Sequence, residues 1–143
     1  MKRLIDESFE VAVPLKAAWD HLAQIEKWPS WAKHIKSVIR NPPGQLSVDT
    51  QGTINLSIGI ATTFKMTELE PMRHWKWRGG LLGAQLDYDH VFTPIAPART
   101  RVQFTIDASG WQVAIVGPAF AAIYWRNLLR AIPLLIAEIE TVR

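Results

Sequence analysis

A histidine between two aromatic residues is the side chain of this sequence best placed to do chemistry. His90 lies in residues 86–92, where apolar and polar residues alternate as they do in a half-buried strand. Tyr88 and Phe92 share its face. A buried neutral imidazole can orient a ligand carbonyl or transfer a proton near neutral pH, with the Tyr88 hydroxyl beside it. A core histidine that is hydrogen-bonded to a hydroxyl or to the backbone is the commoner arrangement and is the alternative.

Other catalytic and metal-binding arrangements lack the residues they need. The sequence has no Gly-x-Ser-x-Gly elbow and no glycine-rich phosphate loop. It has no cysteine, and the four histidines lack the spacing of metal ligands, so we expect neither a metal site nor a cofactor. Asp87 and Asp89 alternate with His90 and should face solvent on the other side of the strand, which argues against an Asp–His pair within this strand.

Aromatic side chains gather on the faces predicted to point inward. The chain has seven tryptophans, and Trp75 and Trp77 are spaced to share one face of a strand. Large rings on one face of a curved sheet suit a pocket for a flat or greasy ligand, although they also suit a filled core. For Trp75, Trp77, Tyr88 and Tyr124, whose polar atoms need partners, the two roles are equally favoured, whereas Trp19 and Trp31 are expected to be structural. The predicted lining is Phe64, Trp75, Trp77, Tyr88, His90, Phe92, Phe104, Phe120 and Tyr124.

The pattern of the chain predicts an antiparallel sheet followed by a long helix. Alternation predicts a strand over 8–13 and six more over 35–40, 50–57, 60–69, 73–78, 86–93 and 100–107. A short helix over 15–25 and one further turn over 31–34 follow the first strand, and the last helix should begin at Gly117. Short connections favour a meander. The last helix is the only large apolar element that can cover the sheet. Because a twisted sheet of this size cannot close completely around a helix, we expect a cavity between them.

The order of these motifs resembles the START-like, helix-grip proteins of the polyketide cyclase/dehydrase and lipid-transport group, which are related to the birch-pollen allergen. The resemblance covers nearly the whole chain. It is carried by residues 11–14 with Ala18-Trp19, by 28–31, by 77–79, by 90–92 leading to 100–102, and by Gly110. It implies an α+β fold with a hydrophobic cavity beneath the long helix, in which such proteins bind lipids, steroids or polyketides. Their functions are diverse.

Composition limits the partners and the compartment. With 143 residues the chain fits one domain over 1–143, and 16 basic residues are interspersed with 13 acidic ones. Nucleic-acid binding would require clustered basic residues, so we expect none. Asp6 and Glu7 arrive before any apolar segment of a secretory signal, and no uninterrupted apolar run approaches the length of a spanning helix. We therefore expect a cytoplasmic protein.

Three classes of function are compatible with these features. The leading hypothesis is a non-catalytic protein that binds, sequesters or carries a small hydrophobic ligand, such as a lipid, polyketide, prenyl or aromatic compound. The second is an enzyme of the cyclase/dehydratase type in which His90 and Tyr88 move protons. The third is an interaction role, in which the apolar last helix contacts a membrane, another protein or a second copy in a homodimer.

Overall fold

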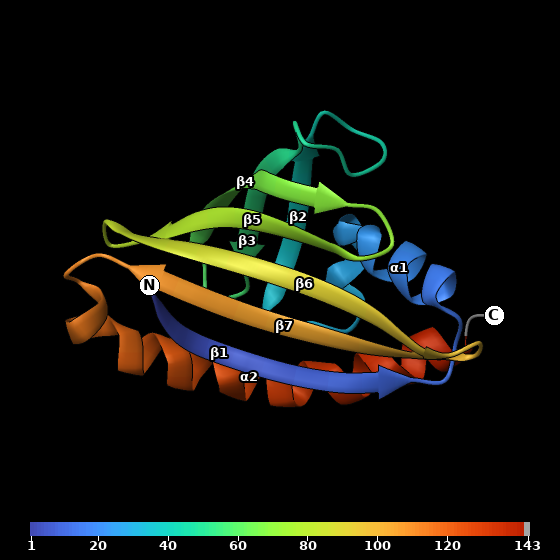
Figure 1. The fold of residues 1–143 in the computed structure, drawn as a ribbon. Coiled ribbons are helices and arrows are strands. Elements are labelled where there is room, and N and C mark those ends of the chain that lie inside the picture. The colour runs from blue at the N-terminus through green and yellow to red at the C-terminus, as the bar shows by residue number, and fades with distance from the viewer. Residues whose placement is uncertain (142–143) are drawn as a thin grey trace.

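The protein forms one curved antiparallel sheet with a long helix along one side (Figure 1). The computed structural model describes residues 1–141, apart from the Leu81 side chain. The seven strands lie in the order β1-β7-β6-β5-β4-β3-β2. They are β1 (Lys2–Val11), β2 (Ile35–Asn41), β3 (Gln51–Leu56), β4 (Ala61–Glu70), β5 (His74–Leu81), β6 (Ala84–Ala96) and β7 (Arg99–Ser109). The predicted helix-grip α+β class is confirmed.

Strand register brings the inward aromatic residues into rows across the sheet. Trp75 of β5 lies opposite His90 of β6, which lies opposite Phe104 of β7. The neighbouring row joins Trp77 to Tyr88 and Tyr88 to Ile106. Because side chains directly opposite one another in antiparallel strands are in contact range, these rows bring large rings together on the concave face.

Two short helical segments follow β1 and supply a second set of rings. Helix α1 (Leu15–Ala23) begins after Pro14, and a 3₁₀ helix, η1 (Ile25–Ser30), follows directly. Trp19 of α1 and Trp28 of η1 are buried against the sheet. The rings are therefore covered by the α1–η1 segment as well as by the long helix.

The long helix α2 (Val113–Thr141) lies along the edge strand β1, at the bottom of Figure 1. The prediction that it begins at Gly117 is wrong, because α2 begins four residues earlier and continues through Pro118 and Pro133. Gly117 instead lies buried inside the helix, where a Cβ would be 3.6 Å from Leu4 of β1, an ordinary contact, and 3.2 Å from Val113, a tighter contact within α2.

Both carboxylates of α2 tie its C-terminal end to the α1 side of the molecule. Glu138 accepts a hydrogen bond of 2.8 Å from Ser30 and lies 2.8 Å from His21 Nε2. Glu140 accepts from the backbone N–H of Ala12 at 2.8 Å. The hydrogen bonds to Glu138 and Glu140 hold this end of α2 in place.

The close approach of three strands at Gly52 gives the first prediction. A Cβ at Gly52 would overlap the carbonyl oxygen of Ile39 and lie 2.8 Å from Phe64 Cζ. Because backbone cannot move away cheaply, Gly52→Ala should lower the free energy of unfolding by at least about 2 kcal/mol, measured by chemical denaturation. The matched control is Gly80→Ala in β5, whose Cβ would lie 3.6 Å from its nearest neighbour. Equal stabilities of the two variants would contradict this packing.

Candidate functional site

Aromatic rings fill most of the concave face of the sheet. Trp75 and Trp77 are 0% and 2% exposed. The ring of Trp75 stacks on His90 with centroids 4.6 Å apart, and Trp77 packs against Phe64 at 4.3 Å. The predicted cavity between sheet and helix is therefore small in this structure, because tryptophans from α1 and η1 pack against those of the sheet and occupy most of the space.

A small cavity of about 30 Å³ remains beside this aromatic cluster. That volume suits about two water molecules, whereas drug-sized ligands occupy pockets of about 300 Å³ or more. Its walls come from three parts of the chain: the segment from η1 to β2, strands β6 and β7, and α2. The lining residues are Trp28, Trp31, Ala32, His34, Ile35, Tyr88, Asp89, His90, Phe104, Thr105, Ile106, Tyr124 and Leu128.

His90 lies at this cavity with one ring nitrogen fixed and the other free. Its Nδ1 is 3.1 Å from the carbonyl oxygen of Trp75. Because a carbonyl only accepts hydrogen bonds, Nδ1 carries the proton and Nε2 keeps a lone pair. Among the described residues no donor bonds to Nε2, which is not fully buried. Burial lowers the pKa of His90 to about 4, so the imidazole is neutral at physiological pH and offers an acceptor.

The only two tyrosines of the chain line the same cavity. Tyr88 of β6 and Tyr124 of α2 have ring centroids 6.1 Å apart. Burial raises the pKa of both hydroxyls, that of Tyr124 to about 12, so both stay protonated. Within residues 1–141 neither hydroxyl has a hydrogen-bond partner. The cavity therefore combines a histidine acceptor with two phenolic hydroxyls in apolar walls.

The predicted lining divides into three groups. Tyr88, His90, Phe104 and Tyr124 line the cavity. Phe64, Trp75, Trp77 and Phe92 are buried in the aromatic cluster behind it. Phe120 is partly buried and packs on Tyr124 at 5.6 Å, outside the cavity lining. Strand alternation placed the sheet residues on the correct face, but the space beside each ring depends on neighbours that alternation does not specify.

Several wall residues were not among the predicted lining. Trp28 packs on both Trp77 and His90, with centroids 5.5 and 5.7 Å away. Trp31, His34 and Leu128 complete the same walls. For Trp28 and Trp31, the sequence held an indication in Trp28-Pro29-Ser30-Trp31, where two tryptophans flank a proline that can start a helix. Leu128 lies one turn beyond Tyr124 on α2, which places both on one helix face.

The two aspartates beside His90 are less solvated than expected, and Asp89 also borders the cavity. Asp87 is 7% exposed and accepts a hydrogen bond of 2.9 Å from Arg78. Asp89 lies 2.8 Å from His74 Nδ1. Both carboxylates are thus engaged by side chains of β5, and His90 has no aspartate partner. Within residues 1–141 no group of three histidine, cysteine or acidic residues is arranged to hold a metal ion.

One polar atom of the aromatic cluster is buried without a partner. Trp75 Nε1 has no hydrogen-bond acceptor among the described residues, and Trp75 does not line the cavity. A buried unpaired donor of this kind costs about 1–3 kcal/mol. The cluster therefore contains an unpaired donor, Trp75 Nε1, and an unpaired acceptor, His90 Nε2, on rings that stack on each other.

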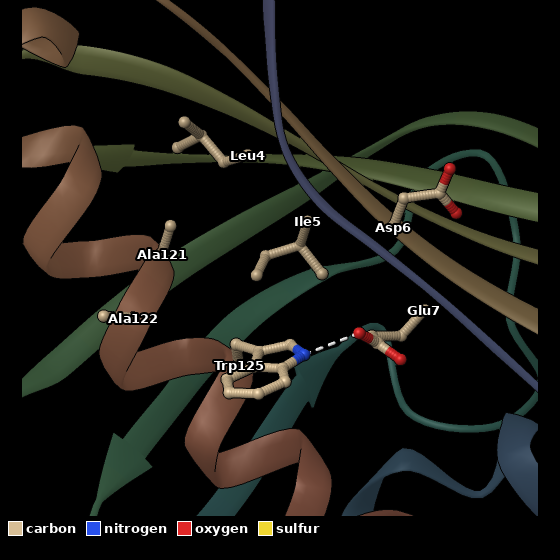
Figure 2. A pocket seen from close by; sticks show the side chains of 7 residues that line it. All are labelled: Leu4, Ile5, Asp6, Glu7, Ala121, Ala122 and Trp125. Carbon is tan, nitrogen blue, oxygen red and sulfur yellow. Dashed lines mark hydrogen bonds between the residues drawn. The ribbon is translucent and has the colours of Figure 1, made fainter.

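A larger concavity of about 480 Å³ lies on the surface between β1 and α2 (Figure 2). Ala121 and Ala122 leave space opposite Leu4 because their side chains are short. Trp125 bridges helix and strand by donating a hydrogen bond of 2.6 Å to Glu7. This groove is open to solvent and contains neither histidine nor tyrosine, so the chemistry of the candidate site lies in the interior cavity.

The environment of His90 predicts a measurable titration and tautomer. The ordinary pKa of histidine is 6.5 and that of His90 is about 4, so lowering the pH between these values protonates His90 only in the unfolded chain. The free energy of unfolding should therefore fall by about 3 kcal/mol as the pH is lowered through this window. The His90→Gln variant should lack this pH-dependent loss. The control His74→Gln, on the outer face, should keep it. Nitrogen NMR should show the proton on Nδ1; a proton on Nε2 or a pKa near 6.5 would contradict the assignment.

Comparison with known proteins agrees with this architecture. Similar solved structures include the Zhui aromatase/cyclase from Streptomyces sp. R1128, with a TM-score of 0.71, 18% identity, and coverage of 95% of this chain and 92% of that one. A START superfamily protein from Mycobacterium smegmatis has a TM-score of 0.74 and 16% identity, and the match covers 97% of this chain and 98% of that one. At these identities the likeness shows the fold alone. No curated protein matches the chain. The family model described as "Polyketide cyclase / dehydrase and lipid transport" matches residues 2–132, and the chain belongs to that family.

Proposed function

We propose that residues 1–143 form a single ligand-binding domain that takes a small, neutral, hydrophobic molecule bearing a hydroxyl group. The observation that carries this proposal is the Nε2 of His90, which has no hydrogen-bond partner among the described residues and lies at one cavity with two tyrosine hydroxyls that have none either. A nitrogen lone pair at an apolar cavity needs a donor to form a hydrogen bond. A ligand with a hydroxyl group supplies that donor, which a purely apolar ligand does not.

The charges around the cavity favour a neutral ligand. No lysine or arginine is among its lining residues. Burial lowers the pKa of both histidines in the lining, His34 and His90, which disfavours the cation that would pair with a carboxylate. Burying an unpaired anion in such a site is strongly unfavourable. Phenols, enols and alcohols on a ring system fit these constraints, because each donates an O–H to Nε2 and accepts from Tyr88 or Tyr124.

The described state is the closed one, so binding requires the walls to separate. A bicyclic ring is several times larger than the cavity of about 30 Å³. Tyr124 and Leu128 of α2 form one wall, and the residues of β6 and β7 form the opposite one. We expect α2 to move away from the sheet at Tyr124 when a ligand enters, with the bond between Trp125 and Glu7 as the nearest link to be broken.

Binding of a phenolic probe tests this proposal. 2-Naphthol should change the tryptophan fluorescence of the protein, because Trp28 and Trp31 line the cavity. Ala32→Leu places a larger side chain in the wall and should weaken binding at least about tenfold. The matched control Ala119→Leu adds the same atoms to an exposed position of α2 and should leave the affinity for 2-naphthol unchanged.

Tyr124→Phe should weaken binding of 2-naphthol about threefold to tenfold, because the hydroxyl is lost. No response to the probe, or equal affinity of both leucine variants, would contradict the proposal.

A second candidate is an enzyme of the cyclase/dehydratase type, favoured by the free lone pair of His90 beside two phenolic hydroxyls. His90 would accept a proton from an acidic carbon of a poly-carbonyl substrate, and a tyrosine would donate to a carbonyl oxygen. A general base is most effective with a pKa near the working pH. The pKa of His90, about 4, makes it a weak base and so ranks this candidate second.

The His90→Gln variant separates the two candidates. Glutamine retains a hydrogen-bonding group in the position but has no titratable nitrogen. If the protein is an enzyme, turnover of a poly-carbonyl chain should fall at least about a hundredfold while ligand affinity changes little, as expected for a lost general base. Steady-state kinetics with a matched binding assay measures this. Unchanged turnover would remove His90 from the mechanism.

A further inference from the structure

The outward face of α2 is apolar where a helix on a protein surface would ordinarily be polar. Residues 108–125 contain no charged side chain. Ile115 is 69% exposed and Ile123 is 62% exposed, while Trp111, in the turn before α2, is 74% exposed. In Figure 1 no element covers the side of α2 that faces away from the sheet. Water therefore faces a continuous apolar surface of isoleucine, alanine, proline and tryptophan.

Hydropathy sets α2 apart from a helix whose apolar residues serve the core. An 18-residue window of α2 has a mean hydropathy of 1.2, and α2 has the length and composition of a helix that could cross a membrane. Only 17% of that window is buried. The apolar character of α2 thus exceeds what packing on the sheet uses. Exposed apolar surface of this extent marks an interaction site.

The charges on this face are of one sign. Arg126 and Arg130 follow the uncharged stretch, and both are exposed. Among the described residues neither forms an ion pair. The only carboxylates of α2 are Glu138 and Glu140, and both are bonded toward the α1 side. The face therefore presents apolar side chains with two free guanidinium groups and no free carboxylate.

We propose that this face, defined by Trp111, Ile115, Ile123, Leu129, Arg126 and Arg130, docks on an anionic lipid surface. Tryptophan favours the boundary between headgroups and acyl chains, and isoleucine and leucine enter the acyl layer. Arginine pairs with phosphate, and cationic side chains are drawn to anionic lipids. A second copy of the chain is the poorer occupant, because a two-fold interface would bring the same arginines together with no carboxylate to pair them.

Vesicle flotation with the full chain tests the proposal. The protein should float with vesicles of phosphatidylcholine mixed with phosphatidylserine, more weakly with phosphatidylcholine alone, and less as salt rises. Arg126→Glu with Arg130→Glu should weaken binding to the mixed vesicles by more than about fivefold per arginine. Lys33→Glu with Lys36→Glu makes the same change of charge on exposed residues elsewhere and is the control.

The apolar part of the face has its own matched variants. Ile115→Glu with Ile123→Glu should reduce binding to both vesicle types at least about tenfold. Ile58→Glu with Ile60→Glu replaces isoleucines that are 78% and 58% exposed at the turn between β3 and β4, and should leave binding unchanged. Circular dichroism checks that every variant folds.

Three results would overturn the proposal. The first is no flotation with either vesicle. The second is equal loss in the α2 variants and their controls. The third is a concentration-dependent dimer in analytical ultracentrifugation that Ile115→Glu with Ile123→Glu abolishes while vesicles fail to bind, which would make this face a homodimer interface.

Discussion

The packing of indole rings against His90 is the interaction on which the rest of this structure depends. Trp75 stacks on the imidazole at 4.6 Å, and Trp28 closes over it at 5.7 Å. These rings remove His90 from water, which lowers its pKa to about 4 and keeps it neutral. The bond from Nδ1 to the Trp75 carbonyl then directs the remaining lone pair to Nε2. Packing and this hydrogen bond thus leave a neutral acceptor at the cavity.

The same packing explains why the site is closed. Rings that interlock at van der Waals contact leave only about 30 Å³ beside them, enough for water but not for a ring system. In the proposed function, a ligand would have to separate these rings. Apolar burial would then contribute about 25 cal/mol per Å² of ligand surface, and the polar atoms without partners would favour a hydroxyl. Helix α2 has one face toward this cavity and another toward solvent, so movement of α2 would couple the two.

The sequence predicted the fold, and the strand face on which each side chain lies, better than the size of the space between the sheet and the helices. Alternation identified all seven strands, and it placed Trp75, Trp77 and His90 inward because side chains in a strand change face at each residue. It did not reveal that Trp28 would enter the same space, since that depends on how η1 crosses the sheet. The start of α2 was missed because Gly117 followed by Pro118 was read as a terminus, whereas both residues lie inside the helix. The bonds of Glu138 and Glu140 join distant segments and have no local pattern.

The most direct test of the central claim is nitrogen NMR of the His90 imidazole during titration with 2-naphthol. If the cavity opens around a hydroxylated ring, the Nε2 resonance should move toward that of a hydrogen-bonded acceptor while Nδ1 stays protonated and bonded to Trp75. An Nε2 resonance that stays fixed at saturating probe would contradict the account. Backbone amide shifts confined to Leu4 and Trp125 would also contradict it, because they would place the ligand in the surface groove.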